Sequence, residues 1–201
     1  MGFLKIQNTY KMKKAKLYTW LIKSDLGAIG KNSIILPPFQ ANDASSLKSL
    51  FIGDDCAIWS GGWIEPIKSY CDINYESRIE IGDRTYIGRN SHIIACDKMR
   101  IGKDVVIADN VYITDNLHGY ENPDSSILYS HLVVRGPVVI DDQAWLGERV
   151  CIMPGVTIGK HAVIGSNSVV TKDIPPYCVA VGSPARVIKK YDPASGKWIT
   201  C

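Results

Sequence analysis

The sequence lacks any run of apolar residues long enough to cross a bilayer. A transmembrane helix needs about 20 consecutive apolar residues, whereas the apolar stretch LYTWLI occupies only positions 17–22. The small-residue cleavage site of a secretory signal is also missing here. We therefore expect a cytoplasmic protein, either free or held at the inner membrane surface.

Paired cysteines are absent as well, because no two of the six cysteines form a CxxC motif. They are scattered along the chain as Cys56, Cys71, Cys96, Cys151, Cys178 and Cys201. Neither a disulfide framework nor a zinc site has this spacing. We expect reduced thiols that pack as small hydrophobic side chains, and no bound metal.

Acidic residues are scarce at the start of the chain. Residues 1–31 hold seven lysines and a single acid, Asp25, whereas the whole chain has a net charge of only +3. We treat residues 1–30 as a basic segment that is partly helical. Such a segment could touch an anionic membrane surface or an anionic sugar carrier. A solvated terminal helix is the simpler alternative, and we expect no nucleic acid among the partners.

An aliphatic residue returns at every sixth position through much of the chain. The longest block runs Ile140, Leu146, Ile152, Ile158, Ile164, Val170, and shorter blocks run Ile81, Ile87, Ile93 and Ile101, Ile107, Ile113. Six steps smear a stripe around a helix, and a lone strand repeats every two residues. A period of six instead indicates a strand and a corner repeated many times, the pattern of a solenoid.

A second inward position lies four residues after each aliphatic residue, and it is small or β-branched. It holds Thr85, Ser91, Val105, Val111, Ala144, Val150, Val156, Ala162 and Ser168. Three such units close a triangular coil of about 18 residues, and coils stack about 4.8 Å apart. Glycine or asparagine is expected at corners that need positive φ or close backbone approach. We predict an all-β parallel β-helix over residues 31–190, followed by a tail, 191–201, with residues 174–201 forming an irregular C-terminal cap.

The pattern of an aliphatic residue, glycine, two free positions and a small residue resembles the hexapeptide repeat of a family of acyltransferases. The segment AWLGERVCIMPGVTIGKHAVIGSNSVVTKDIPPYCVAVGSPARVIKK (144–190) is similar to the maltose, galactoside and polysaccharide O-acetyltransferases. The resemblance is strong over residues 79–190. It implies a left-handed coil, acetyl-CoA as the acyl donor, a carbohydrate acceptor, and a homotrimer with active sites between subunits.

The repeats stop after Ile113–His118 and resume near Val138, so residues 119–137 form a protruding loop. A long loop in a compact protein is usually functional or disordered. His118 lies where the chain leaves the coil, and the resemblance makes it the catalytic base. An imidazole can take a proton from an acceptor hydroxyl. Asp115, Asn116 and Glu121 are the candidates for orienting it, and the sequence does not choose among them.

Among the remaining site residues, Asn90 and the coenzyme A contacts follow from the same resemblance, whereas Tyr120 is a candidate for stacking on a sugar ring and Asp115 and His131 are candidates because they lie near or within the loop. For the acceptor, we predict contacts with Asn90, Asp115, Tyr120 and His131. For coenzyme A, we predict contacts with Trp145, Gly147, Gly165, Ser166, Thr171, Lys172 and Arg186, the last two as cations for the phosphates. Ser166–Asn167 replaces the more usual Ala-Gly pair, which puts backbone access there in doubt.

Four hypotheses about the function have to be weighed. The first is O-acetylation of a hydroxyl on a sugar or cell-surface glycan precursor by direct transfer. The second is N-acetylation of an amino sugar, or acetylation of a xenobiotic. A non-enzymatic β-helix scaffold is the third. A carbonic-anhydrase-like metal site is the fourth, but it needs three converging histidines, and the histidines here fall at the wrong phases of the repeat.

Overall fold

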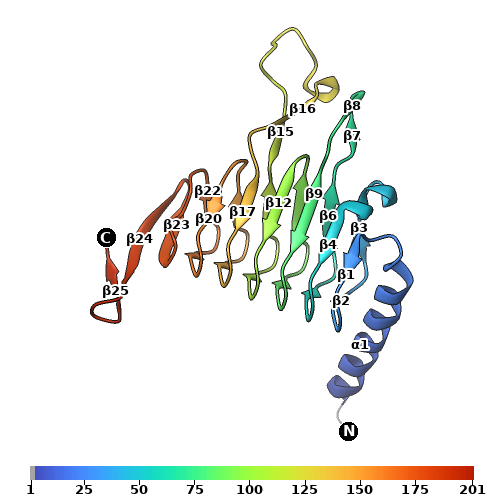
Figure 1. Ribbon diagram of the computed structural model, residues 1–201, viewed down its shortest axis with the longest axis horizontal. Helices are drawn as coiled ribbons and strands as arrows, with labels where there is room; N and C mark the ends of the chain where they lie inside the picture. Colours follow the sequence, from blue (N-terminus) through green and yellow to red (C-terminus); the bar gives the residue numbers. More distant parts are fainter. Residues whose placement is uncertain (1–2) are drawn as a thin grey trace.

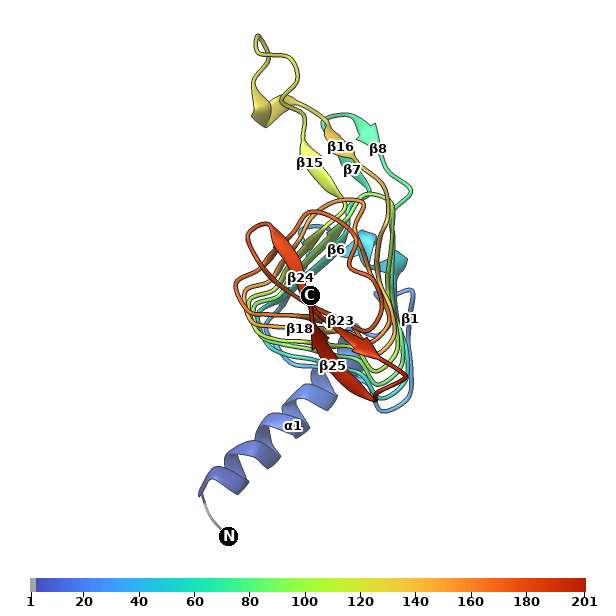
Figure 2. The same cartoon turned by 90° about the vertical axis from the view of Figure 1, so that its left-hand side faces the viewer.

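The computed structural model describes residues 3–201, with side chains described from Thr9 onward. The short strands of three sheets form the sides of a triangular prism (Figure 1 and Figure 2). One helix, α1 (Phe3–Ile22), lies at the N-terminal end of the prism.

Each sheet is built from parallel strands taken from successive turns of the chain. The first sheet contains, in spatial order, β1 (Ala28–Ile29), β4 (Leu50–Ile52), β9 (Arg78–Ile81), β12 (Lys98–Ile101), β17 (Val138–Ile140) and β20 (Thr157–Ile158). The second contains β2 (Ile34–Ile35), β5 (Ala57–Ile58), β10 (Tyr86–Ile87), β13 (Val106–Ile107), β18 (Trp145–Leu146), β21 (Val163–Ile164) and β23 (Cys178–Gly182). The third contains β3 (Phe39–Gln40), β6 (Gly62–Pro66), β11 (His92–Ala95), β14 (Tyr112–Thr114), β19 (Cys151–Ile152) and β22 (Val169–Val170).

The chain visits the three sheets in turn, which is the topology of a parallel β-helix. Register keeps equivalent residues in line, so that Ile87 pairs with Ile58 on one side and with Ile107 on the other. All twelve aliphatic positions of the three repeat blocks are buried, and so are the nine small positions. The predicted inward positions are therefore confirmed, and they form the aliphatic ladders of one continuous core.

Glycine and asparagine play different parts at the corners. Gly88 follows an aliphatic position, and a Cβ added there would lie 2.4 Å from the carbonyl carbon of Ala108 in the next coil. Glycine at this position thus permits coils to approach closely. Positive φ occurs two residues later, at Asn90 (φ 53°), and equivalent corners use Arg84 and Arg149 as well as asparagine. The expectation of glycine or asparagine at positive φ is too narrow, because tight stacking holds other residues in this conformation.

The C-terminal segment differs from the irregular cap that the prolines suggested. After Pro175 and Pro176, β23 pairs in parallel with β21 and then turns back into β24 (Ala185–Asp192), which pairs with β25 (Lys197–Thr200). Strand β24 pairs with both β23 and β25 in the antiparallel direction, so the prolines end the coil but not the sheet. The predicted boundary at residue 191 falls inside β24.

Two long hairpins leave the prism at one corner, where the third sheet turns into the first. We call it the third-to-first corner; it contains residues 67–77, 115–137 and 171–173. The first hairpin pairs β7 (Ser69–Tyr70) with β8 (Ile73–Asn74), and the second pairs β15 (Asn116–His118) with β16 (Leu132–Val134). The second carries the short helix η2 (Ile127–Tyr129). A further short helix, η1 (Ala44–Ser49), lies in the connection between β3 and β4. Both hairpins project from the same side of the prism (Figure 1).

Candidate functional site

His118 is the last residue of β15, and it lies opposite Leu132 in the antiparallel pairing with β16. Leu132 is buried whereas His118 is exposed. The next residue, Gly119, donates its N–H to the carbonyl oxygen of His131 at 2.9 Å, which extends the pairing by one step. The predicted loop therefore begins as a regular hairpin, and His118 is held by main-chain pairing at the base of it.

The β7–β8 hairpin, which leaves the prism two coils earlier, supports the start of the β15–β16 hairpin. The hydroxyl of Tyr75 donates to the carbonyl oxygen of Leu132 at 3.1 Å and accepts from the N–H of the same residue at 3.0 Å. Tyr70 donates its hydroxyl to the carbonyl oxygen of Leu128 at 2.9 Å. Tyr75 and Leu132 are 57 positions apart, and Tyr70 and Leu128 are 58 positions apart. These hydrogen bonds therefore hold together two hairpins that are distant in the sequence.

The imidazole of His118 packs edge-on against the ring of Tyr70, with centroids 5.4 Å apart and planes at 73°. The side chain is exposed, and within residues 9–201 the imidazole forms no hydrogen bond, so no described protein group occupies its ring nitrogens. Packing against an aromatic ring fixes the orientation of the imidazole without occupying its nitrogens. This arrangement suits a proton acceptor that meets its substrate from solvent.

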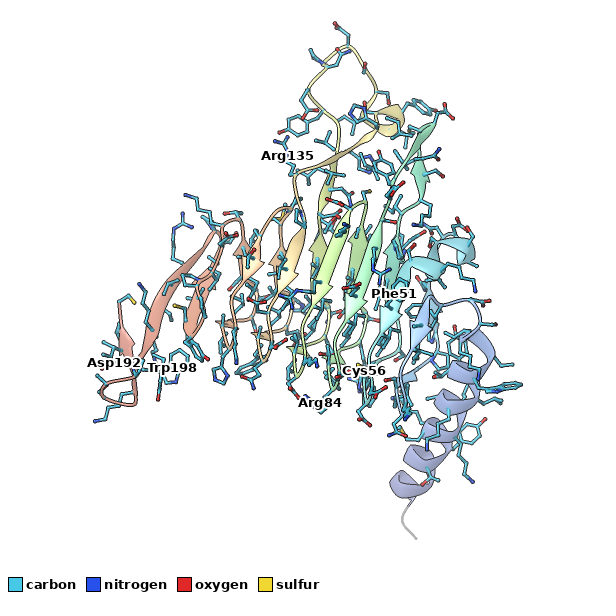
Figure 3. All side chains as sticks on the ribbon, viewed as in Figure 1. Phe51, Cys56, Arg84, Arg135, Asp192 and Trp198 are labelled. Carbon is cyan, nitrogen blue, oxygen red and sulfur yellow. The ribbon has the colours of Figure 1, made fainter. Side chains whose placement is uncertain are left out.

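None of the three candidates for orienting His118 reaches it in the single chain. Asp115 is fully buried and accepts from the N–H groups of Cys96 and Asp97, both at 2.8 Å, and from the side chain of Asn116 at 2.9 Å. Glu121 forms an ion pair with Arg135 at 3.1 Å instead. Figure 3 shows Arg135 near the base of the loop.

Asp115 also fails as a contact for the acceptor, since its oxygens face inward. Burial raises the pKa of its carboxyl, although the three donated hydrogen bonds act in the opposite direction. The main-chain carbonyl oxygen of Asp115 accepts from the N–H of Arg135 at 3.1 Å. Asp115 precedes the loop and Arg135 lies near its end, so this hydrogen bond holds the two ends of the loop together. The structure makes Asp115 an anchor at the start of the loop, an orientation that no sequence pattern predicts.

The other predicted acceptor residues of the loop are exposed. Tyr120 projects into solvent. His131 lines a hollow of about 540 Å³ with Cys71, Gly119, Glu121 and Tyr129 among its walls. The hollow lies between the two hairpins, next to the base that carries His118. Hydrogen bonds from the N–H groups of Glu121 itself and of Tyr120 lower the pKa of the Glu121 carboxyl.

The predicted acceptor residue Asn90 lies at a different corner, where the second sheet turns into the third. We call it the second-to-third corner; it contains residues 88–91, 108–111, 147–150 and 165–168. The side-chain amide of Asn90 donates to the side-chain oxygen of Asn110 in the next coil at 3.4 Å. A single chain therefore does not bring Asn90 and His118 together.

Most of the predicted coenzyme A contacts follow this same corner toward the C-terminus. Trp145 lies exposed on the second sheet just before it. A Cβ on Gly147 would lie 2.7 Å from the nitrogen of Ser166, so glycine keeps two coils in contact there. Asn167 takes positive φ (60°), which confirms that asparagine can serve this corner. Arg186 is exposed in β24, opposite Val181 at the end of β23.

Thr171 and Lys172 lie apart from that group. They follow β22 at the third-to-first corner, the corner that also bears His118, and both are exposed. Neither Lys172 nor Arg186 forms an ion pair with any residue in the described part of the chain. The predicted site residues thus fall into two groups on two corners of the prism, with the third sheet between them.

Sequence reasoning missed Tyr70, Tyr75 and the hairpin that carries them. The segment SYCDINY turns at Cys71 and Asp72, which both have positive φ. Hairpins of this kind usually signal themselves by Asn-Gly or Asp-Gly, and that signal is absent here. No group of three His, Cys, Asp or Glu residues suited to a metal ion occurs within the residues that the structure describes.

Comparison with known proteins places this architecture among acyltransferases. Family models described as "Bacterial transferase hexapeptide (six repeats)" and "Hexapeptide repeat of succinyl-transferase" match residues 137–172 and 78–115. Galactoside O-acetyltransferase of Escherichia coli K12 is 37% identical over 148 residues, which are 73% of this chain and 67% of the relative. The chain thus spans about two thirds of the length of that relative.

Solved structures agree with this result. A galactoside acetyltransferase in complex with coenzyme A is 30% identical, with a TM-score of 0.59 over 88% of this chain and 70% of that one. A variant of AntD, an N-acyltransferase from Bacillus cereus, has a TM-score of 0.71 at 18% identity, over 89% of this chain and 90% of that one, and it shares the fold. From the repeats, the buried ladders and these matches, the chain belongs to the hexapeptide-repeat acyltransferases, and it resembles the galactoside and polysaccharide O-acetyltransferases.

Proposed function

We propose that this protein moves an acetyl group from acetyl-CoA to a hydroxyl of a sugar or of a cell-surface glycan precursor, with His118 as the general base. We further propose that its coil is left-handed and that it works as a homotrimer with active sites between subunits. Support for the acyl donor comes from the family and from the relative that carries coenzyme A. Support for a sugar hydroxyl comes from the 37% identity to a galactoside O-acetyltransferase.

The observation that carries the proposal is the setting of His118. Its main chain is fixed by the β15–β16 pairing, its ring packs against Tyr70, and its side chain is exposed, while the next residue, Gly119, lines an open hollow. A base must be held rigidly and yet be reachable by the hydroxyl that it deprotonates. His118 combines both properties at the corner where the family resemblance predicts the catalytic base.

In the reaction that we propose, the imidazole takes the proton of the acceptor hydroxyl as its oxygen attacks the thioester carbonyl. The tetrahedral intermediate then collapses, the carbon–sulfur bond breaks, and the imidazolium returns the proton to the sulfur. The products are the acetyl ester and free coenzyme A, and no acyl-enzyme forms. General base catalysis of this kind typically contributes about 10²–10⁴-fold.

The division of the predicted residues between two corners supports sites between subunits. His118, Thr171 and Lys172 lie at the third-to-first corner, whereas Asn90, Gly147 and Gly165 lie at the second-to-third corner. When cyclic symmetry closes a trimer, one corner of each subunit can face the other corner of its neighbour. Two groups that are separate in one chain would then complete a single site.

The experiment that tests the function measures release of free thiol from acetyl-CoA while different acceptors are offered. The panel contains neutral mono- and oligosaccharides, amino sugars and simple xenobiotic alcohols. The proposal expects thiol release with a neutral sugar and its loss in His118→Ala. Release with amino sugars alone, with an amide as product, would favour the N-acetyltransferase alternative. No release with any acceptor or with water would favour the scaffold.

A further inference from the structure

Helix α1 is attached to the prism along one face. The hydroxyl of Thr19 accepts from the N–H of Ile35 at 2.8 Å and donates to the carbonyl oxygen of Ala15 at 2.8 Å. Ala15 and Thr19 are buried, and the ammonium of Lys11 lies 4.4 Å from the ring centroid of Trp59 on the prism. These contacts fix which side of the helix points away from the protein.

The opposite side of α1 is apolar and exposed. Tyr10, Leu17, Trp20 and Leu21 are between 58% and 70% exposed, although each has a large apolar side chain. Successive members of this group are seven, three and one residues apart, and this spacing places all four on one side of a helix. Large apolar side chains gathered on one exposed surface indicate a surface that meets another apolar phase or partner.

Lysines surround this apolar surface. Lys13 lies within it, Lys14 flanks it on one side, and Lys16 and Lys23 flank it on the other, and all four are exposed. The helix contains no acidic residue at all. The charge of this surface is therefore of one sign along its whole length.

A hollow next to the helix adds a third observation. It has a volume of about 480 Å³ between α1 and the first coil, and Lys16, Lys23, Lys31 and Trp20 contribute to its walls. The nearby carboxylate of Asp54 already accepts the N–H of Lys31 at 2.7 Å. Three lysines and a tryptophan that line one hollow suit an anionic group such as a phosphate, because each lysine carries a positive charge.

We propose that α1 is a docking surface for a membrane rich in anionic lipids. The side chains of Leu17, Trp20 and Leu21 enter the interface, and the hollow lined by lysines receives a lipid phosphate. Tryptophan favours this depth because its ring is apolar and its N–H is polar. Lysines keep their charged ends among the headgroups while their stems cover apolar surface.

Charge complementarity favours a membrane over a second copy of this chain that pairs through the same face of α1. If two copies paired through the same face of α1, the lysines of each would face the lysines of the other, and like charges in contact repel. An anionic bilayer offers the opposite sign, and each lysine near it strengthens binding severalfold at physiological salt.

The docking surface and the candidate active site are independent. Figure 2 shows α1 and the hairpin of β15 and β16 on opposite sides of the prism. Docking through α1 therefore leaves the loop and His118 facing away from the bilayer. Changes to α1 should alter membrane binding without altering acetyl transfer in solution.

The test measures co-sedimentation of the full chain with vesicles of phosphatidylcholine alone or with phosphatidylglycerol added. We expect binding to the anionic vesicles, loss of binding in high salt, and no binding to neutral vesicles. Replacing Lys16, Lys23 and Lys31 by Gln should weaken binding by at least about tenfold. Replacing Leu17 and Trp20 by Ser should do the same.

The matched control replaces Lys189, Lys190 and Lys197 by Gln, because these three lysines are equally exposed but lie in β24 and β25. This variant should bind vesicles like the wild type, and circular dichroism should show that all variants keep the fold. Free glycerol phosphate at millimolar concentration should compete only weakly, since it lacks the apolar phase. The proposal is overturned if neutral vesicles bind equally well, if the control variant loses as much affinity, or if the wild type binds no vesicles.

Discussion

The ring of Tyr70 lies 5.4 Å from the imidazole of His118, at an angle of 73°, although the two residues come from different coils of the prism. Tyr70 belongs to the β7–β8 hairpin, and His118 belongs to the β15–β16 hairpin. The earlier hairpin has no core of its own, yet Tyr70 contacts the ring of His118 and the main chain of η2, and Tyr75 contacts the main chain of β16. We infer that the β7–β8 hairpin serves to hold His118 in place.

Tyr70→Ala should lower the turnover number without raising the KM for acetyl-CoA. An aromatic contact of this geometry contributes about 0.5–1.5 kcal/mol, so its loss should reduce kcat by about two- to thirteenfold. Tyr70→Phe keeps the ring and should retain most of the activity. A loss as large in Tyr70→Phe as in Tyr70→Ala would show that the hydroxyl bond to Leu128, rather than the ring, is what matters.

His118→Ala should reduce kcat by about 10²–10⁴-fold while the affinity for acetyl-CoA stays nearly constant. The side chain is exposed and outside the aliphatic ladders, so the fold should not change. His161→Ala is the matched control, because that histidine is also exposed but lies at the corner between the first and second sheets. Steady-state kinetics of the two variants make the comparison. Equal activity in both would remove His118 from the mechanism.

The coil could be predicted from the sequence because each hexad repeats the same physical constraint. An aliphatic residue such as Ile152 pairs with an aliphatic residue in the coil before it and with another in the coil after it. Because this constraint recurs at many positions, those positions together indicate one structure. The place where the repeat stops marked the loop base for the same reason. Regularity therefore gave both the fold class and the location of His118.

The details of the loop base could not be predicted, because they depend on contacts between distant residues. Tyr75 binds Leu132 across 57 positions, and no local pattern encodes that distance. Asp115 looked like a polar residue near the site, but the N–H groups of Cys96 and Asp97 draw it inward. Likewise, the antiparallel strands after Pro176 depend on the free edge that the last coil offers.

Iodoacetamide should distinguish Cys96 from the exposed cysteines. Burial, with a smaller contribution from the charge of Asp115, raises the pKa of the Cys96 thiol to about 12. Raising the pKa keeps the thiol neutral, so at pH 8 only about one molecule in 10⁴ carries the reactive thiolate. Mass spectrometry of alkylated peptides should show rapid labelling at Cys201 and almost none at Cys96. In guanidinium chloride Cys96 and Cys201 should react alike. Equal labelling of these two cysteines in the folded protein would contradict the burial of Cys96 at the start of the loop.

Lys172→Gln and Arg186→Gln should each weaken coenzyme A binding with little effect on turnover at saturation. Each residue offers an exposed cation without an ion-pair partner among residues 9–201, and a phosphate contact acts equally on ground state and transition state. The expected result is a KM for acetyl-CoA raised by about tenfold. Lys197→Gln, in β25, is the control. If kcat falls and KM does not, the two residues act elsewhere in the mechanism.

Mixed trimers should regain activity that neither parent variant has. His118→Ala lacks the residue at the third-to-first corner, and Asn90→Gly lacks the residue at the second-to-third corner while glycine keeps the positive φ of that position. If each site takes one corner from each of two neighbours, random mixing in equal amounts leaves about a quarter of the sites intact. When the two variants are co-expressed with different tags, purification through both tags in succession keeps only trimers that contain both variants, and each of these has one intact site among its three. The purified mixed trimers should therefore show about a third of the wild-type turnover, and light scattering should give three times the 22.2 kDa of one chain. Sites within a single chain predict no recovery at all, because every chain then lacks one of the two residues.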